Sequence, residues 1–205
     1  KGEAIPTNPG KHSNLEGPID MISSIEMINQ APIGKSSRSN PVTYVKAYDS
    51  IRKLFSDQQL SKIRGYDPKH FSFNVEGGRC ETCKGDGNIT IEMQFLADVN
   101  LVCDECKGKR FKSEILEVRY DDLNINEVLN LTIEEAIKYF AKKKDIVSKL
   151  QPLFDVGLGY VKLGQSSSTL SGGEAQRVKL ASFMTREYES QNILFIFDEP
   201  TTGLH

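Results

Sequence analysis

The sequence predicts an α/β protein that combines a parallel-sheet core, a helical subdomain and an inserted four-cysteine metal-binding module. Three observations support this prediction. The apolar run Ile193–Phe197 has the length of a strand buried on both faces, and it ends in an acidic pair. A helix with two glycines in its first turn should begin near Ser171. Two Cys-x-x-Cys pairs lie nineteen residues apart earlier in the chain.

The composition is that of an ordinary globular protein. Of the 205 residues, 38% are hydrophobic and 26% are charged, and the formal net charge is -2. This total does not require nucleic acid, so any DNA contact must come from a local basic patch. No secretory signal is found, and no apolar stretch approaches the ~20 residues of a membrane-spanning helix. Because the chain starts without Met, we expect a piece of a longer protein. The four cysteines fall in one short block, which favours metal over disulfides and therefore a reducing, cytoplasmic compartment.

Periodicity and capping signals predict the remaining elements. A strand is expected at 24–28, and a helix at 44–55, where the apolar side chains form one stripe. Alternating apolar and polar residues predict a half-buried strand at 89–95, and 114–120 is a second strand candidate. Thr132 and Glu135 form a capping box that should open a helix. A further helix is expected at 145–154.

All four cysteines of the chain belong to the two Cys-x-x-Cys pairs. Zinc prefers a tetrahedron of soft thiolates, and each pair presents two of them on one side. The spacing therefore predicts a structural zinc site, whose four protein ligands leave no position open for catalysis. Unligated buried thiols or two disulfides are the alternatives. The predicted ligands are Cys80, Cys83, Cys103 and Cys106.

Basic residues surround the two cysteine pairs. Contact with DNA phosphates is one interpretation of this cluster. A solvated charged face is the other, and acidic residues mixed into the same segments favour it. The candidate DNA-binding residues are Lys84, Lys107, Lys109, Arg110 and Lys112.

The run that begins at Ser171 has the features of a phosphate-binding helix. Ser171 and Glu174 make a second capping box, which places the start of a helix at Ser171. Gly172 and Gly173 leave the first backbone N–H groups bare, and a bare helix N-terminus attracts phosphate. An ordinary capped helix with a flexible start is the alternative.

The acidic pair after Ile193–Phe197 lies where open α/β sheets bind ligands. Asp198 is expected to hold Mg²⁺ directly or through water, and Glu199 to polarise an attacking water as general base. An acidic turn after a core strand is the alternative. The preceding glycine-rich helix favours the catalytic interpretation.

Several runs together resemble the second ATPase half of the UvrA family. They are LSGGEAQRVKLA, ILFIFDEPTTGLH, GRCETCKGDG, CDECKGKR and INQAPIGKSSRSNPVTY. The resemblance implies a partial ABC-type P-loop ATPase core at 1–47, a zinc-binding insertion at 48–122, and a helical signature subdomain with the Walker B strand at 123–205. It implies Zn²⁺, ATP and Mg²⁺ as cofactors.

The same resemblance implies roles for individual residues and partners. Gln30 resembles the Q-loop glutamine that senses Mg²⁺ and the γ-phosphate. The signature residues Ser171, Gly172 and Gly173 would close over ATP held by the opposite ATPase half, and Asp198 and Glu199 would be the Walker B pair. The implied setting is nucleotide excision repair and the SOS response, with damaged double-stranded DNA, a UvrB-like partner and a homodimer of the full-length protein.

One motif departs from the family pattern. A Walker A loop needs a glycine five residues before its Gly-Lys-Ser, but Asn29 occupies that position ahead of Gly34. We therefore expect the chain alone to bind zinc but to hydrolyse ATP negligibly. The alternatives are an ATPase of another ABC branch, such as a transporter or drug-resistance homologue, and a zinc-dependent module of an Hsp40-like chaperone.

Overall fold

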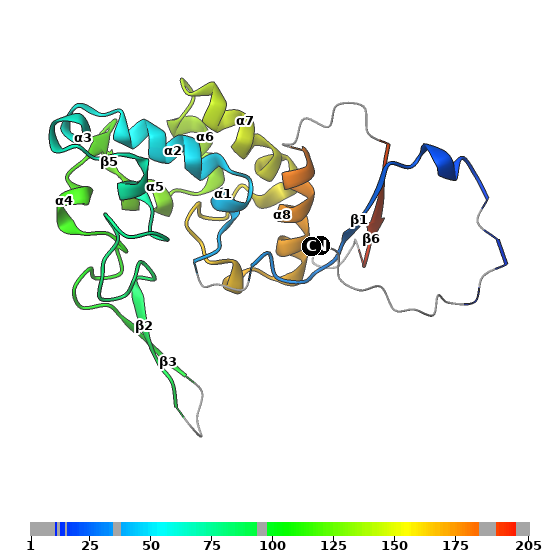
Figure 1. The fold of residues 1–205 in the computed structure, drawn as a ribbon, viewed down its shortest axis with the longest axis horizontal. Coiled ribbons are helices and arrows are strands. Elements are labelled where there is room, and N and C mark those ends of the chain that lie inside the picture. Colours follow the sequence, from blue (N-terminus) through cyan, green and yellow to red (C-terminus); the bar gives the residue numbers. More distant parts are fainter. Residues whose placement is uncertain are drawn as a thin grey trace.

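The fold has three visible parts: a helical body, a projecting β-hairpin and a separate pair of strands (Figure 1). The structure is a computed structural model, which describes residues 11, 13–14, 16–34, 38–93, 98–184 and 192–199. The Lys35 and Ser36 positions, the far end of the strand predicted at 89–95, and the loop at 201–205 lie outside these residues.

Eight α-helices are described. Their bounds are α1 Pro41–Tyr44, α2 Ala47–Ser56, α3 Gln59–Arg64, α4 Ser113–Leu116, α5 Ile125–Asn130, α6 Ile133–Tyr139, α7 Lys144–Leu153 and α8 Gly172–Met184. Shorter helical turns are η1 Ile19–Met21, η2 Pro68–Phe71, η3 Phe154–Leu158 and η4 Ser167–Thr169. Within the described residues, no helix has the length and apolar character needed to cross a membrane.

Six strands form three two-stranded sheets in the described part of the chain. β1 (Ser24–Ile28) pairs with β6 (Ile193–Phe197) in parallel, from Ser24 opposite Ile193 to Ile28 opposite Phe197. β2 (Asn88–Ile91) and β3 (Val99–Val102) form the antiparallel hairpin, and β4 (Arg119–Tyr120) pairs with β5 (Leu123–Asn124). The strand predicted at 24–28 and the parallel arrangement of Ile193–Phe197 are confirmed.

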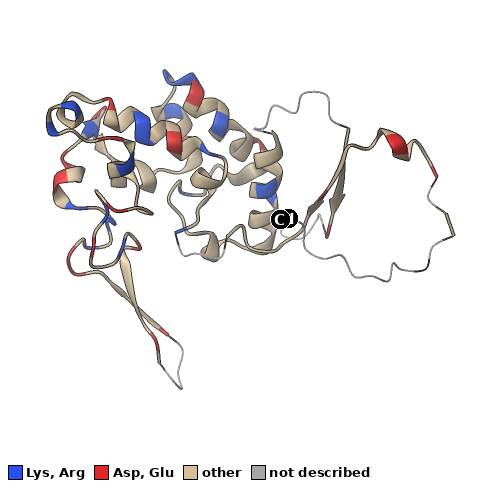
Figure 2. Ribbon diagram, in the orientation of Figure 1, with Lys and Arg blue, Asp and Glu red and all other residues tan. Residues whose placement is uncertain are grey.

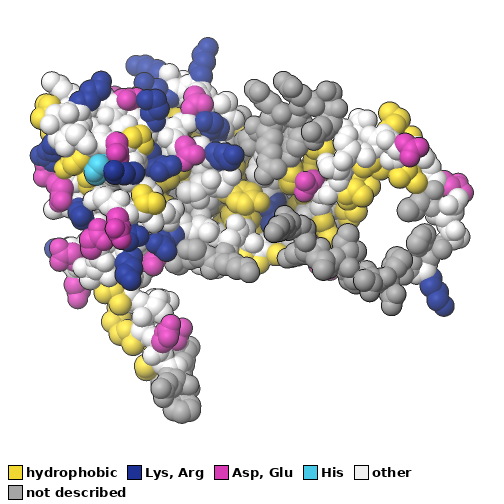
Figure 3. Space-filling view, viewed as in Figure 1, with side chains coloured by type: hydrophobic (Ala, Val, Ile, Leu, Met, Phe, Trp, Pro, Cys, Tyr) yellow, Lys and Arg dark blue, Asp and Glu magenta, His cyan; other side chains and the backbone are white. Residues whose placement is uncertain are grey.

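The prediction that Ile193–Phe197 is buried on both faces is wrong for this chain. Leu194 is 42% exposed and Ile196 is 45% exposed. β1 is the only strand that pairs with β6 among the described residues, and α8 contacts the pair through Phe183, whose ring centre lies 5.3 Å from that of Phe195. Figure 3 shows hydrophobic atoms at the surface of this strand pair and along the projecting hairpin.

One apolar core runs through the helical body. Phe55 of α2, Phe111, Leu150 of α7 and Val178 of α8 all belong to it and are fully or almost fully buried. α2 packs against both η2 and α7, and the Tyr48 hydroxyl donates a 2.6 Å hydrogen bond to the carbonyl of Phe71. The core therefore joins residues on both sides of the predicted boundary at 122, and the proposed domain limits stay a prediction.

The helix predicted at 44–55 begins later than expected. Asn40 caps the short α1 by accepting a 2.9 Å bond from the Thr43 N–H, and the chain then turns at Lys46, whose φ is 59°. This left-handed residue interrupts the helical hydrogen bonds, so α2 starts at Ala47. The apolar stripe is confirmed from that point, because Tyr48, Ile51 and Phe55 are buried.

The two helices predicted later in the chain are confirmed with small shifts. The Thr132 N–H donates to Glu135 Oε2 at 2.8 Å, and the Glu135 N–H donates to Thr132 Oγ1 at 3.2 Å, which is the predicted capping box of α6. α7 begins one residue early, at Lys144, and continues as the π-helical turn Phe154–Leu158. That turn ends the helix at Gly157, whose φ is 79°.

Two strand predictions are corrected. The hairpin strand β2 is exposed along its whole length rather than half-buried, because the hairpin projects away from the helical body (Figure 1). The segment 114–120 is not a strand: it forms α4, and only Arg119–Tyr120 is extended. Ile115 and Val118 are both buried. Their spacing of three residues suits a helical turn, which explains the outcome.

Candidate metal centre and nucleotide site

The four predicted ligands form a compact cluster at the base of the hairpin. Their Sγ atoms all lie within 4.8 Å of one another, with 3.9 Å between Cys80 and Cys103 and 3.6 Å between Cys83 and Cys106. All four are buried and free of disulfides. A tetrahedral zinc site with Zn–S bonds of about 2.3 Å implies sulfur–sulfur distances near 3.8 Å, so the donor set fits zinc.

The two cysteine pairs adopt the same backbone turn. The residue after the second cysteine is left-handed in both, with φ of 51° at Lys84 and 50° at Lys107. Each following glycine is also left-handed, with φ of 87° at Gly85 and 79° at Gly108. Each turn is hydrogen-bonded to the segment that follows the other turn. The Cys80 N–H donates to Arg110 O at 2.8 Å, and the Cys103 N–H donates to Gly87 O at 2.9 Å.

Burial makes the bare cluster a poor place for thiolates. Desolvation raises the pKa of the Cys106 thiol to about 12 and also raises the pKa of Cys83. A backbone N–H bond from Cys106 lowers the pKa of Cys103. Four thiolates so close together need a cation among them, and metal binding to such a site releases protons.

Arginines connect this module to the helical body. Arg110 Nη1 donates to the carbonyl of Gly164 at 3.3 Å, and its guanidinium lies 5.3 Å from the ring centre of Phe73. Burial lowers the pKa of Arg110. Arg38 Nη1 donates to the carbonyl of Lys84 at 3.2 Å. Arg110 thus has contacts inside the fold that a surface cation lacks.

The other predicted DNA-binding residues lie at the surface of the module. Lys84, Lys107 and Lys109 are exposed and make no ion pair among the described residues. Lys112 is half-buried and lies 3.5 Å from Glu81. Acidic and basic residues are interspersed along the ribbon of the module (Figure 2), so the local charge is mixed rather than strongly basic.

The predicted phosphate-binding helix is α8. The Ser171 N–H donates to Glu174 Oε2 at 2.7 Å and the Glu174 N–H donates to Ser171 Oγ at 3.2 Å, which confirms the capping box. The N-terminus of α8 lies directly on Gln30, because a Cβ placed at Gly172 would be 2.6 Å from Gln30 Oε1. A larger residue at this position would have to displace the Gln30 side chain.

The acidic pair follows β6, as predicted. The Asp198 N–H donates to the carbonyl of Ile28 at 3.2 Å, so Asp198 lies beside the end of β1. Both carboxylates are exposed. Glu199 has a φ of 47°, a left-handed conformation that is uncommon for a residue with a side chain and is enriched at functional sites.

Two polar residues that the sequence reasoning missed join these parts. The Gln176 side chain donates to the carbonyls of Ile28 and Asp198, at 2.9 Å and 2.7 Å. Lys179 Nζ contacts the carbonyl and the side-chain oxygen of Asn29, at 3.1 Å and 2.6 Å. Gln176 and Lys179 follow Gly172 by four and seven residues, so the three residues share one face of α8. This helical spacing is the sequence signal that could have identified Gln176 and Lys179.

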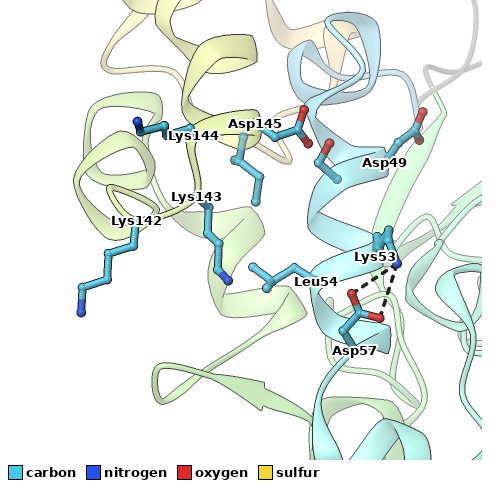
Figure 4. Close-up of a pocket in the computed structure, with 10 residues that line it drawn as sticks. Asp49, Lys53, Leu54, Asp57, Lys142, Lys143, Lys144 and Asp145 are labelled. Carbon is cyan, nitrogen blue, oxygen red and sulfur yellow. Dashed lines mark hydrogen bonds and ion pairs between the residues drawn. The ribbon is translucent and has the colours of Figure 1, made fainter.

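A hollow of about 540 Å³ lies between α2 and the start of α7, and none of the predicted site residues lines it (Figure 4). Its acidic side chains form local ion pairs. The distance from Lys53 Nζ to Asp57 Oδ2 is 3.3 Å, and the distance from Lys149 Nζ to Asp145 Oδ1 is 2.9 Å. The acidic side chains that line the hollow are therefore already paired within the chain.

The fold and the site define a class. A parallel strand pair ending in an acidic pair, a glycine-opened helix beside it and an inserted four-cysteine module constitute part of an ABC-type ATPase core. No protein-family model matches the chain. Comparisons with known proteins show which branch of this class the segment represents.

The chain is 55% identical over 198 residues to the UvrABC system protein A of Clostridium acetobutylicum, covering 97% of this chain and 21% of that protein. It is 54% identical over 198 residues to the corresponding protein of Methanothermobacter thermautotrophicus, covering 97% and 20%. The crystal structure of UvrA2 from Deinococcus radiodurans matches with a TM-score of 0.87 and 46% identity, over 93% of this chain and 23% of that one.

By sequence and by structure, this segment belongs to the UvrA family. The chain spans about a fifth of the length of the curated relatives it matches. The similarity covers the cysteine module and the ATPase motifs together, so neither a transporter ATPase nor a chaperone module is favoured.

Proposed function

We propose that this chain is part of a UvrA-type ATPase that recognises DNA damage in nucleotide excision repair. The observation that carries the proposal is the meeting of three predicted nucleotide elements at one place. Gln30, the N-terminus of α8 and the end of β6 lie together in the fold although they are far apart in the sequence. The similarity to UvrA proteins over 97% of the chain supports it.

The residues have distinct proposed roles in ATP hydrolysis. Asp198 would hold Mg²⁺, and Glu199 would orient and deprotonate the attacking water. The bare N–H groups at Gly172 and Gly173 and the hydroxyl of Ser171 would contact the phosphates of ATP held by the opposite ATPase half. Gln30 fits a sensing role, because its Nε2 is buried with no hydrogen-bond partner in the described structure.

The cysteine module would hold a structural Zn²⁺ and help to read DNA. Cys80, Cys83, Cys103 and Cys106 supply a closed set of four ligands, and zinc bound there contributes folding free energy rather than catalysis. The proposed phosphate contacts are the exposed lysines Lys84, Lys107 and Lys109, together with the half-buried Lys112. Arg110 is left out of this surface because of its contacts within the fold.

The partners follow from the proposed family role. Double-stranded damaged DNA is the substrate, a UvrB-like protein is the partner, and the full-length ATPase is a cytoplasmic homodimer. The apolar faces of β1 and β6, where Ile25 and Leu194 are exposed, would pack against the rest of the ATPase core. Expression as part of the SOS response belongs to the same proposal.

ATP turnover tests the proposal in a full-length UvrA-family protein that carries this segment. The Glu199→Gln variant should lose about 100-fold or more in kcat while still binding ATP, because it removes the general base. Glu92→Gln, an exposed carboxylate on the hairpin, is the matched control and should keep its activity. Unchanged turnover in Glu199→Gln, or Glu199-dependent turnover by the 205-residue chain alone, would contradict the proposed roles.

The salt dependence of DNA binding tests the lysine surface. Each phosphate contact adds about 0.9 to the slope of log affinity against log salt concentration, so replacing both Lys107 and Lys109 by Ala should reduce the slope by about 2. A control variant with Ala at Lys62 and Lys144, two exposed lysines outside the module, should retain the slope. Equal losses in both variants would show that the module has no specific share in DNA binding.

A further inference from the structure

We infer that Gln176 and Lys179 are positioning residues that lock the signature helix α8 to the ends of β1 and β6. This inference rests on the proposed function, because it assigns these residues a part in ATP turnover. It adds two residues to the nucleotide elements, and neither of them contacts the expected position of ATP.

Gln176 makes the central contact. It is only 5% exposed, and its single amide nitrogen donates both of its hydrogens, to Ile28 O at 2.9 Å and to Asp198 O at 2.7 Å. Asp198 in turn donates its N–H to Ile28 O at 3.2 Å. One side chain therefore binds a carbonyl at the end of each strand, and without it the buried Ile28 carbonyl and the Asp198 carbonyl would each lose a donor.

Lys179 makes a second contact almost one turn further along α8. Its Nζ lies 2.6 Å from Asn29 Oδ1 and 3.1 Å from Asn29 O. No carboxylate pairs with this ammonium among the described residues. Lys179 thus binds Asn29, which lies between two other residues that α8 contacts. Gln176 binds Ile28 on one side, and Gly172 lies against Gln30 on the other.

The three contacts form a continuous interface. Gly172, Gln176 and Lys179 are spaced by four and three residues, so they share one face of α8. They bind residues 28–30 and 198, which lead directly to Gln30 and Glu199. Because hydrogen bonds join α8 to both strand ends, a displacement of the helix must displace the Walker B carboxylates and the Q-loop glutamine with it.

This geometry explains why a glutamine suits position 176. An amide nitrogen offers two coplanar N–H groups, which match two neighbouring carbonyls. A glutamate of the same size would offer none and would place a negative charge against both carbonyl oxygens. The Gln176→Glu substitution is therefore the sharpest perturbation, and Gln176→Met removes the donors without adding charge.

Hydrogen exchange on the 205-residue chain tests the contact itself. In Gln176→Glu, amides at 193–198 and 24–30 should exchange about tenfold faster, since both strand ends lose a hydrogen bond to α8. Gln59→Glu, an exposed glutamine at the start of α3, should exchange like the wild type. If Gln176→Glu does not fold, Gln176→Met carries the test. Unchanged exchange in either folded variant overturns the inference.

Kinetics of a full-length UvrA-family protein carrying this segment test the positioning role. Gln176→Met and Lys179→Met should lower kcat about tenfold while KM for ATP changes less than about threefold, because the carboxylates are misplaced but the phosphate contacts remain. Lys179→Arg keeps the donors and should restore kcat. Faster exchange with unchanged kcat would show a purely structural contact and overturn the positioning role. A wild-type protein without ATP turnover would instead refute the proposed function and leave the exchange result standing.

Discussion

The two matching cysteine turns allow a prediction with an internal control, the pair Gly85→Ala and Gly108→Ala. These glycines occupy equivalent places, and both are left-handed, with φ of 87° and 79°. Alanine in that conformation costs about 1–2 kcal/mol at either position. Any difference between the variants must therefore come from the surroundings of the added methyl group.

Those surroundings differ strongly. A Cβ at Gly85 would lie 1.9 Å from the carbonyl oxygen of Phe73, whereas at Gly108 the nearest atom is Val102 Cγ1, 3.6 Å away. Phe73 cannot withdraw easily, because its ring is fully buried and packs against Tyr48, with 5.3 Å between ring centres. Overpacking of this kind costs about a further 1–3 kcal/mol.

We therefore expect Gly108→Ala to lower the free energy of unfolding by about 1–2 kcal/mol and Gly85→Ala by about 2–5 kcal/mol. Urea unfolding of the zinc-loaded chain measures the two losses. Competition with a chelator supplies a second measurement, because metal affinity is coupled to folding and falls about tenfold per 1.4 kcal/mol. Equal losses in the two variants, or a larger loss in Gly108→Ala, would refute the reasoning.

Two further predictions concern the metal and a helix cap. Cys103→Ser should lose most of the bound zinc and open the module locally, as measured by metal analysis and hydrogen exchange; full zinc content would contradict it. The hydrogen bond from the Thr132 N–H lowers the pKa of Glu135, so its stabilising effect is present above the ordinary glutamate pKa and is lost as the pH falls through the lowered value. Glu135→Ala should therefore cost more stability at pH 7 than near pH 3 in urea titrations, and a pH-independent cost would argue against the cap.

Features set by neighbouring residues were predictable from the sequence. The capping boxes at Thr132 and Ser171 and the strand Ser24–Ile28 appear where the residues indicate, because their hydrogen bonds or alternation extend over only a few positions. The four cysteines also come together as their spacing suggests.

The elements predicted less well depend on what packs against them. Segment 114–120 has strand-like composition but becomes helical where Ile115 reaches the core, and β6 remains partly exposed because β1 is its one strand neighbour in the described part of the chain. The residue composition of a strand does not show which of its faces other elements will bury.

By itself, the sequence determined the chemistry available to this protein: four thiols at metal-binding spacing, a glycine-opened helix and a strand ending in two carboxylates. Only the tertiary structure decided which of these parts meet. Gln176 binds Ile28 across 148 positions, and Arg110 binds Gly164 across 54. Such pairings depend on how the whole core folds, and residues this distant in the chain show no periodicity that would reveal them.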